Sequence, residues 1–208
     1  MRITTTLIMA FCLSIAGFAQ QSRFNTFSLE AGGGVHMPFL PSDNLDRMAF
    51  ISVNQFQVAG RYMFSETFGL KVQYAHHVFA DRKATDESLT QHKMTVEAVY
   101  NIGEALNFNY TFYERFALLM HAGVGVSTLK PNSLSEYEYT PTIQGGLTPL
   151  IRLSDKMALY LDGTLVVNVG QKYAYNGQPI SSALGIFPTA NAGLVFYIGD
   201  RRYHADWF

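Results

Sequence analysis

Apolar and polar side chains alternate along most of this chain, most clearly in residues 188–199. Every second residue there is apolar, namely Ala190, Ala192, Leu194, Phe196 and Ile198, and the residues between them are mostly small or polar. Successive side chains of a strand point to opposite faces, so this strand has one wholly apolar face. A membrane barrel turns such a face to lipid and fills its lumen with the other.

Seven further segments show similar alternation. We expect strands at about residues 25–36, 53–64, 68–79, 94–102, 115–127, 139–153, 157–169 and 188–199. Pro141 and Pro149 weaken the sixth of these predictions, because proline removes a hydrogen-bond donor from the ladder. Transmembrane strands need only about 10 residues each, so all eight are long enough to cross a membrane.

The connections between these segments alternate in length. Residues 37–51, 80–93, 128–138 and 170–185 form long connections, 65–67 and 154–156 form short ones, and 103–114 is intermediate. Long outer loops and short periplasmic turns are typical of up-and-down outer-membrane barrels. The predicted fold class is therefore all-β, an eight-stranded antiparallel up-and-down transmembrane β-barrel in the outer membrane of a Gram-negative-type envelope.

The N-terminus has the pattern of a cleaved secretory signal peptide. Arg2 supplies the positive charge, Leu7 to Gly17 is the apolar stretch, and Gly17-Phe18-Ala19 is a small-x-small cleavage site. We expect a signal peptide at 1–19, the barrel at 20–199 and a short periplasmic tail at 200–208. The single cysteine, Cys12, falls in the signal peptide, so we expect no disulfide or thiolate site in the mature chain.

Composition agrees with a membrane barrel. Only 15% of residues are charged, which is low for a soluble domain, and no run of 18 apolar residues indicates a transmembrane helix. The net charge of -1 gives no reason to expect a nucleic-acid partner. A soluble secreted lipocalin-like barrel is the alternative fold.

Aromatic residues of the apolar faces gather at the ends with short turns. This predicted interface belt contains Phe27, Tyr62, Phe64, Phe68, Tyr100, Phe116 and Phe196. Aromatic rings favour the membrane–water interface, so the belt predicts the periplasmic boundary. A thinner outer belt contains Phe56, Tyr74 and Phe187, and Trp207 of the tail is expected at the inner interface.

The polar faces carry a balanced set of charges. Neighbouring strands place an acid near a base in three predicted pairs: Glu30 with Arg61, Glu97 with Lys71, and Asp162 with Arg152. Facing lipid, such a charge costs about 2–4 kcal/mol at the bilayer midplane, whereas inside a narrow lumen the charges can pair. We expect these six residues to fill the lumen. A gated ion path or proton relay is the alternative use of the same residues.

Histidines suggest two other sites. His76, His77 and His92 lie near one rim, where three histidines could hold a metal, but adjacent strand residues point to opposite faces. His121, Ser127 and Glu97 invite comparison with Ser-His-acid hydrolysis, although His121 lies in mid-strand. We therefore expect no metal, no cofactor and no catalytic residues. Lys93 is assigned to a solvated loop of mixed charge.

Three stretches resemble the membrane barrel of OmpA-like outer-membrane proteins. They are Phe27-Ser28-Leu29-Glu30-Ala31-Gly32-Gly33-Gly34, His121-Ala122-Gly123-Val124-Gly125-Val126-Ser127, and Asn191-Ala192-Gly193-Leu194-Val195-Phe196-Tyr197-Ile198-Gly199. The resemblance implies contact with outer-membrane lipid and assembly by the barrel-assembly machinery, with Phe196 and Phe208 as the assembly signal. The tail His204-Ala205-Asp206-Trp207 resembles a linker to a peptidoglycan-binding domain, but the sequence stops at Phe208, so we do not expect direct cell-wall tethering.

These observations predict a non-enzymatic barrel with a structural role, or an accessory role beside another outer-membrane or periplasmic protein. A narrow channel of the porin kind is the first alternative, and it requires an open lumen. A lipid-modifying outer-membrane enzyme is the second, and it requires a serine, a histidine and an acid together at the rim.

Overall fold

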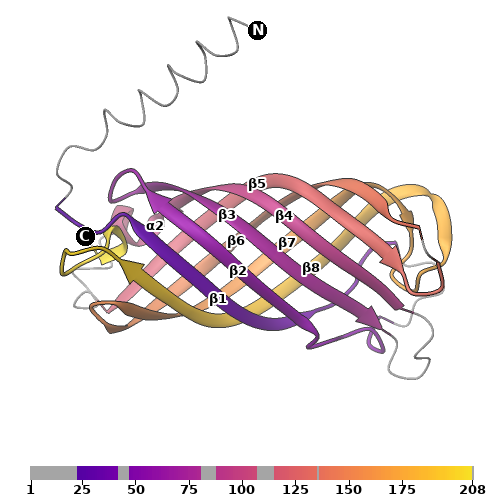
Figure 1. Cartoon of the computed structure of the whole chain (residues 1–208), viewed down its shortest axis with the longest axis horizontal. Coiled ribbons are helices and arrows are strands. Elements are labelled where there is room, and N and C mark those ends of the chain that lie inside the picture. Colours follow the sequence, from indigo (N-terminus) through magenta and orange to yellow (C-terminus); the bar gives the residue numbers. More distant parts are fainter. Residues whose placement is uncertain (1–22, 42–46, 81–87, 107–114, 135, 208) are drawn as a thin grey trace, which may run out of the picture.

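The computed structural model describes residues 23–41, 47–80, 88–106, 115–134 and 136–207. Its strands form one closed antiparallel barrel in chain order, and β1 pairs with β8 to complete the ring (Figure 1). The strands are β1 (Phe27–His36), β2 (Gln55–Met63), β3 (Phe68–Ala80), β4 (Ser88–Asn101), β5 (Phe116–Pro131), β6 (Glu138–Ser154), β7 (Met157–Tyr173) and β8 (Pro179–Ile198). The predicted up-and-down barrel is thus confirmed, while the proposed signal peptide lies outside the described residues.

Two short helical turns accompany the strands. Helix α2 (Ile102–Ala105) follows β4, and η1 (Ala205–Trp207) ends the described chain. Among the described residues, no helix is long and apolar enough to cross a membrane.

Apolar side chains cover the outside of the barrel, and polar side chains fill the inside. Leu29, Val58, Val124 and Leu147 are between 45% and 63% exposed, while Thr95, Glu97, Ser127 and Asn168 are buried. An exposed surface of this kind is stable only against hydrocarbon, and a closed ring leaves no unpaired strand edge in lipid. The barrel therefore belongs in the outer membrane.

At the end of the barrel that carries the long connections, the strands extend beyond the membrane. β5 to β8 contain 16, 17, 17 and 20 residues, although about 9–11 suffice to cross the bilayer. Two predicted loops are accordingly wrong, because β4 begins at Ser88 within 80–93, and β7 and β8 occupy most of 170–185. The apolar alternation ends at the lipid boundary, but backbone pairing continues in water, so the pattern underestimates strand length.

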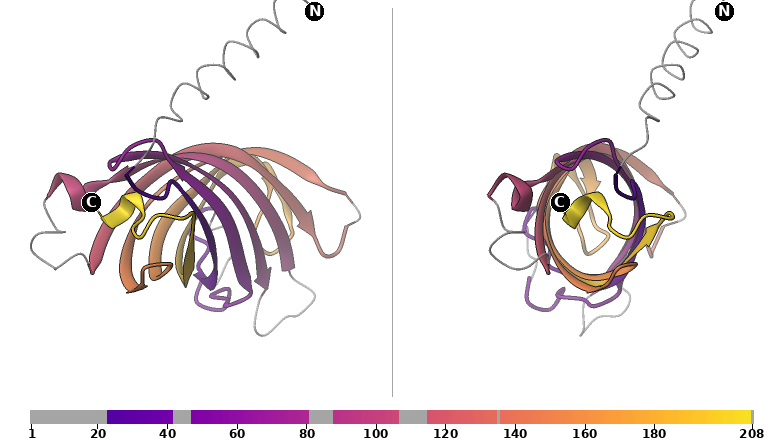
Figure 2. Two further views of the ribbon diagram at one scale, coloured as in Figure 1. Left: turned by 60° about the vertical axis from the view of Figure 1, so that its left-hand side comes forward. Right: turned by 90° about the vertical axis from the view of Figure 1, so that its left-hand side faces the viewer.

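The C-terminal segment folds back over the periplasmic mouth of the barrel. Figure 2 shows it in yellow, lying across the opening when the barrel is viewed along its axis. The turn occurs at Gly199, whose φ of +138° favours glycine. Asn25 then holds the segment, since its backbone N–H donates to the Tyr203 carbonyl at 2.8 Å and its side-chain amide donates to the Arg201 carbonyl at 2.6 Å.

Candidate functional site

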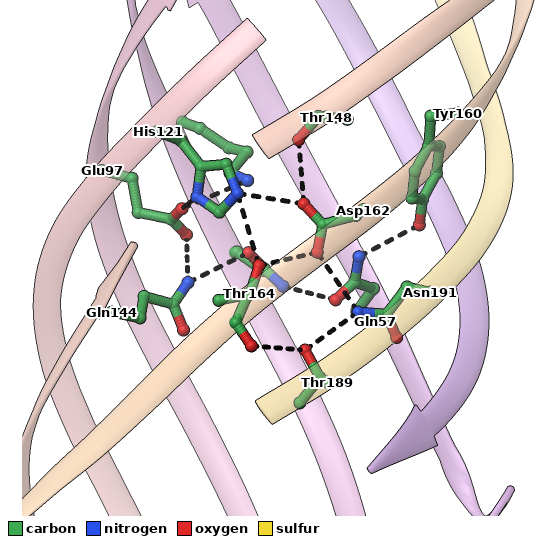
Figure 3. A network of polar contacts seen from close by, with 12 residues as sticks. Gln57, Glu97, His121, Gln144, Thr148, Tyr160, Asp162, Thr164, Thr189 and Asn191 are labelled. Atoms are coloured by element: carbon green, nitrogen blue, oxygen red, sulfur yellow. Dashed lines mark hydrogen bonds and ion pairs between the residues drawn. The ribbon is translucent and has the colours of Figure 1, made fainter. Parts of the chain in front are cut away.

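The centre of the lumen contains a histidine held between two carboxylates. His121 of β5 lies with Nδ1 2.6 Å from Glu97 Oε2 and with Nε2 3.0 Å from Asp162 Oδ2 (Figure 3). Glu97 comes from β4 and Asp162 from β7, so this contact joins three strands through the interior. All three side chains are almost fully buried.

Neighbouring side chains satisfy the remaining oxygens of both acids. Lys71 Nζ lies 3.2 Å from Glu97 Oε2, and Gln144 Nε2 donates to Glu97 Oε1 at 2.7 Å. Around Asp162, the donors are Thr148 at 2.8 Å, Thr164 at 2.7 Å and Asn191 at 3.2 Å. Buried charges are stable only when paired and hydrogen-bonded in this way, so the cluster is a packed polar core.

Glycines make room for this polar core. A Cβ on Gly146 would lie 2.7 Å from His121 Nε2, and one on Gly123 would lie 2.6 Å from Glu97 Cγ. Gly123 is directly opposite Glu97 in the ladder. The lumen-facing glycines of β5 and β6 thus provide the volume that the long charged side chains occupy.

A second polar cluster closes the periplasmic end, and we call residues 203–207 the tail plug. Arg61 donates through Nη1 and Nη2 to the two carboxylate oxygens of Asp206 at 2.5 and 2.8 Å, and through Nε to Glu30 at 2.7 Å. The Tyr197 hydroxyl donates to Asp206 at 3.0 Å. Burial alone would raise the pKa of Asp206, but the Arg61 guanidinium and His204 outweigh burial and hold this pKa well below its usual value.

Aromatic rings fill the rest of the tail plug. His204 stacks on Tyr197, and Trp207 meets Tyr197 edge to face with ring centroids 6.0 Å apart. Trp207 is 2% exposed, so its predicted place at the lipid interface is wrong. Backbone hydrogen bonds of the plug place the Trp207 ring inside the barrel. In one of them, the Ala205 N–H donates to the Asn25 carbonyl at 3.2 Å.

The predicted pair of Arg152 with Asp162 does not form. The ladder places Arg152 opposite Ala158, four residues from Asp162, or about 13 Å along the strand. Arg152 instead donates to Asp155 in the adjacent turn and lies over the Tyr203 ring at 4.3 Å. Glu30 with Arg61 and Glu97 with Lys71 do form ion pairs.

An apolar cluster closes the outer end of the lumen. Phe79, Phe187 and Tyr175 pack ring against ring, with Phe79 centroids 5.1 and 4.5 Å from the other two. Phe187 is fully buried, so its predicted place in the outer belt is wrong. Phe187 alternates in step with Thr189 and Asn191, the lumen-facing residues of β8, so its ring points inward. Below the rings, Gln55 Oε1 lies 3.1 Å from His36 Nδ1 and 2.8 Å from His77 Nδ1.

The structure places every residue of the predicted periplasmic belt on the outer surface of the barrel. The ladder brings Phe27 opposite Tyr62 and Phe68 opposite Tyr100, and Phe64 lies 5.4 Å from Tyr62 between ring centroids. Phe116 and Phe196 alternate with the buried residues Ala117, Val195 and Tyr197. Phe208, the other predicted assembly residue, lies outside the described residues.

The central histidine is not paired with the serine that a Ser-His-acid site requires. Thr164 Oγ1 lies 3.4 Å from His121 Nε2, but this hydroxyl donates its proton to Asp162 Oδ1 at 2.7 Å. Both ring nitrogens of His121 face carboxylates, and Ser127 instead contacts Gln91 at 2.7 Å and Thr142 at 2.6 Å. The described part of the chain contains no group of three or more His, Cys, Asp or Glu side chains arranged for a metal. The three rim histidines are divided, with His77 inside and His76 beside His92 on the outside.

Sequence reasoning missed two charges of the lumen. Lys93 is not in a loop, as the sequence predicts, but is buried in β4 and donates to Gln144. Lys93 is two residues from Thr95 and four from Glu97, so it falls on the same polar face of the strand. That alternation could have placed Lys93 in the lumen. Asp206 gave no such signal, because it follows the last alternating strand.

Comparisons with known proteins agree with this fold. No family model and no curated protein matches the chain. Among solved structures, Neisserial surface protein A superposes with a TM-score of 0.54 at 9% sequence identity, covering 83% of this chain and 97% of that one. A major outer membrane protein from Thermus thermophilus gives a TM-score of 0.52 at 10% identity, covering 83% of this chain and 99% of that one. The chain thus has the fold of the small eight-stranded outer-membrane β-barrels.

Proposed function

We propose that this protein is a non-enzymatic outer-membrane barrel with a structural or accessory role, which it performs through contacts of its outer rim with another envelope protein. The observation that carries this proposal is the filled lumen. The apolar cluster, the central polar core and the tail plug follow one another along the barrel axis. This arrangement favours a role for the surface of the barrel over one for its interior.

A channel is disfavoured by the same observation. A water-filled pore needs a continuous path, whereas here buried side chains occupy both ends and the middle of the lumen. We expect no discrete conductance steps when the purified protein is added to a planar lipid bilayer, while a known porin gives them under the same conditions. Regular steps from a preparation free of other porins would contradict a closed barrel.

An enzymatic role is also disfavoured. A hydrolase site needs a nucleophile within hydrogen-bond reach of its histidine and access for the substrate. His121 has carboxylates at both nitrogens and lies deep in the lumen. The Thr164 hydroxyl near His121 Nε2 is buried as well and donates its proton to Asp162.

The outer rim offers a surface for a partner. Tyr137, directly before β6, is 54% exposed, Tyr139 at the start of β6 is 73% exposed, and Leu134 nearby is 40% exposed. Tyrosine and other large side chains gathered at one place are typical of protein interfaces. Tyr139 is directly opposite Thr128 in the ladder between β5 and β6, so this region lies at the outer boundary of the lipid, where a partner in the envelope can reach it.

Photo-cross-linking in intact cells tests this role. A photoreactive residue at position 139 is expected to give one major protein adduct after solubilisation of the outer membrane in mild detergent. The matched control is position 124 in the lipid-facing band, which is 63% exposed and should give no protein adduct. Recovery of the protein without an adduct at position 139, despite efficient cross-linking of a known complex, would favour a free-standing structural barrel.

A further inference from the structure

Two histidines face each other on the outer surface of the barrel, next to a tyrosine. His76 of β3 and His92 of β4 are directly opposite in the ladder between these neighbouring strands (Figure 1). Their neighbours His77 and Lys93 point into the lumen, so His76 and His92 point outward. Tyr74 precedes His76 by two residues and therefore lies on the same face.

The nitrogens of this pair converge. His76 Nδ1 lies 3.4 Å from His92 Nδ1, and the Tyr74 hydroxyl lies 2.8 Å from the same atom of His92. Two ligands of a tetrahedral Zn²⁺, each about 2.0–2.1 Å from the metal, are separated by about 3.3–3.4 Å. The observed separation of the two nitrogens is therefore the one that a tetrahedral zinc ion requires.

Other ligands fit this geometry less well. Binding of an anion would require protonated imidazoles, and two positive rings with nitrogens 3.4 Å apart would repel each other. Adjacent nitrogens in a square-planar copper(II) site lie only about 2.8–2.9 Å apart. The distance between the two nitrogens thus favours Zn²⁺ over both an anion and copper(II). The Tyr74 oxygen now hydrogen-bonds His92 at 2.8 Å and would move away by about 0.5 Å to complete a tetrahedral set.

The pair lies where water can reach it. Met94 and Val126, one step toward the membrane centre, are 61% and 52% exposed and belong to the apolar band. Thr128 lies directly beside His92 on β5, and Thr90 lies one step from His92 toward the outer loops; both side chains are polar. Phe56 shields one side, with its ring centroid 5.3 Å from that of His76. The site is therefore at the outer boundary of the lipid, with one side protected and another open.

We propose that His76, His92 and Tyr74 bind one Zn²⁺ at this boundary, with water in the fourth position. Each imidazole binds through Nδ1 and keeps its proton on Nε2. Tyr74 binds through its hydroxyl oxygen and gives up its proton to solvent when the metal arrives, so one proton is released for each Zn²⁺ bound. The remaining four histidines of the chain are buried, and only this pair is accessible to added metal.

Titration of the refolded, tag-free barrel with ZnCl₂ by isothermal calorimetry tests the site. We expect saturable binding of one Zn²⁺ per chain, with a dependence on buffer ionisation enthalpy that corresponds to one proton released. His76→Phe and His92→Phe are each expected to abolish saturable binding. Tyr74→Phe is expected to weaken binding at least about tenfold, because loss even of a group that only hydrogen-bonds a metal ligand costs about that much.

Thr128→Val is the matched control, because Thr128 flanks His92 on β5 and shares its exposure but offers no imidazole. It should bind Zn²⁺ like the wild type, and far-UV circular dichroism should show the same strand content for all variants. Wild-type protein that gives no saturable heat, or a His92→Phe variant that binds as tightly as the wild type, would overturn the proposal. So would saturable binding of inorganic phosphate that depends on His76 and His92. An unchanged affinity in Tyr74→Phe would overturn the assignment of Tyr74 as a ligand.

Discussion

Replacing Glu97 with glutamine is expected to lower the free energy of unfolding of the barrel by about 3–5 kcal/mol. The substitution keeps the size of the side chain but removes the negative charge that faces Lys71 Nζ at 3.2 Å and His121 Nδ1 at 2.6 Å. Lys71 would then remain charged and buried without its main partner, which is costly in a closed lumen. Equilibrium urea unfolding in lipid vesicles, followed by far-UV circular dichroism, measures the change.

A double variant separates the missing charge from a disturbed fold. Lys71→Met combined with Glu97→Gln removes both charges, and replacement of a whole buried pair is often close to neutral. We therefore expect the double variant to be more stable than Glu97→Gln alone. Glu66→Gln, in the turn between β2 and β3, is the surface control and should change stability by less than about 0.5 kcal/mol. A Glu97→Gln barrel that unfolds at the wild-type urea concentration would contradict the role of this pair.

Replacing Asp206 with asparagine is expected to release the tail plug from the periplasmic mouth. The free energy that holds the plug in place should fall by about 3 kcal/mol or more. Arg61 and Lys71 are directly opposite in the ladder, so their positive charges repel each other. The Asp206 carboxylate is paired with Arg61 and offsets this repulsion. Without it, Arg61 keeps only Glu30. Trp207 is the single tryptophan and is buried in the plug, so its fluorescence reports release of the tail independently of barrel unfolding.

The same residue predicts how the plug responds to pH. The folded pKa of Asp206 is lowered, so its contribution is fully present above the ordinary aspartate value of about 3.9 and is lost as the pH falls toward the folded value. Trp207 emission of the wild type should therefore shift to longer wavelength only in strong acid, and the Asp206→Asn variant should show the shift already at neutral pH. The exposed Asp200→Asn is the matched control and should behave like the wild type. Identical emission in all three proteins would contradict closure by Asp206.

Local pattern explains why the barrel was readable from sequence. In an alternation of period two, the apolar residues show which face of a strand contacts lipid. This can be read for each strand separately, without knowledge of its neighbours. Glu30 with Arg61 and Glu97 with Lys71 followed from the same pattern, because up-and-down order makes their strands neighbours. Loop boundaries did not follow, since strands such as β8 continue to pair after the lipid requirement ends.

The sequence by itself thus determined the closed barrel, the direction of each strand's two faces and the charged character of the lumen. Only the tertiary structure decided which charges meet across it. The bridge from Glu97 through His121 to Asp162 spans strands that are not all neighbours, and it depends on how the ring closes. Arg152 was misassigned because its partner depends on strand register, and Asp206 was missed because its position depends on the backbone reversal at Gly199. Contacts of this kind arise from three-dimensional closure, which no local alternation encodes.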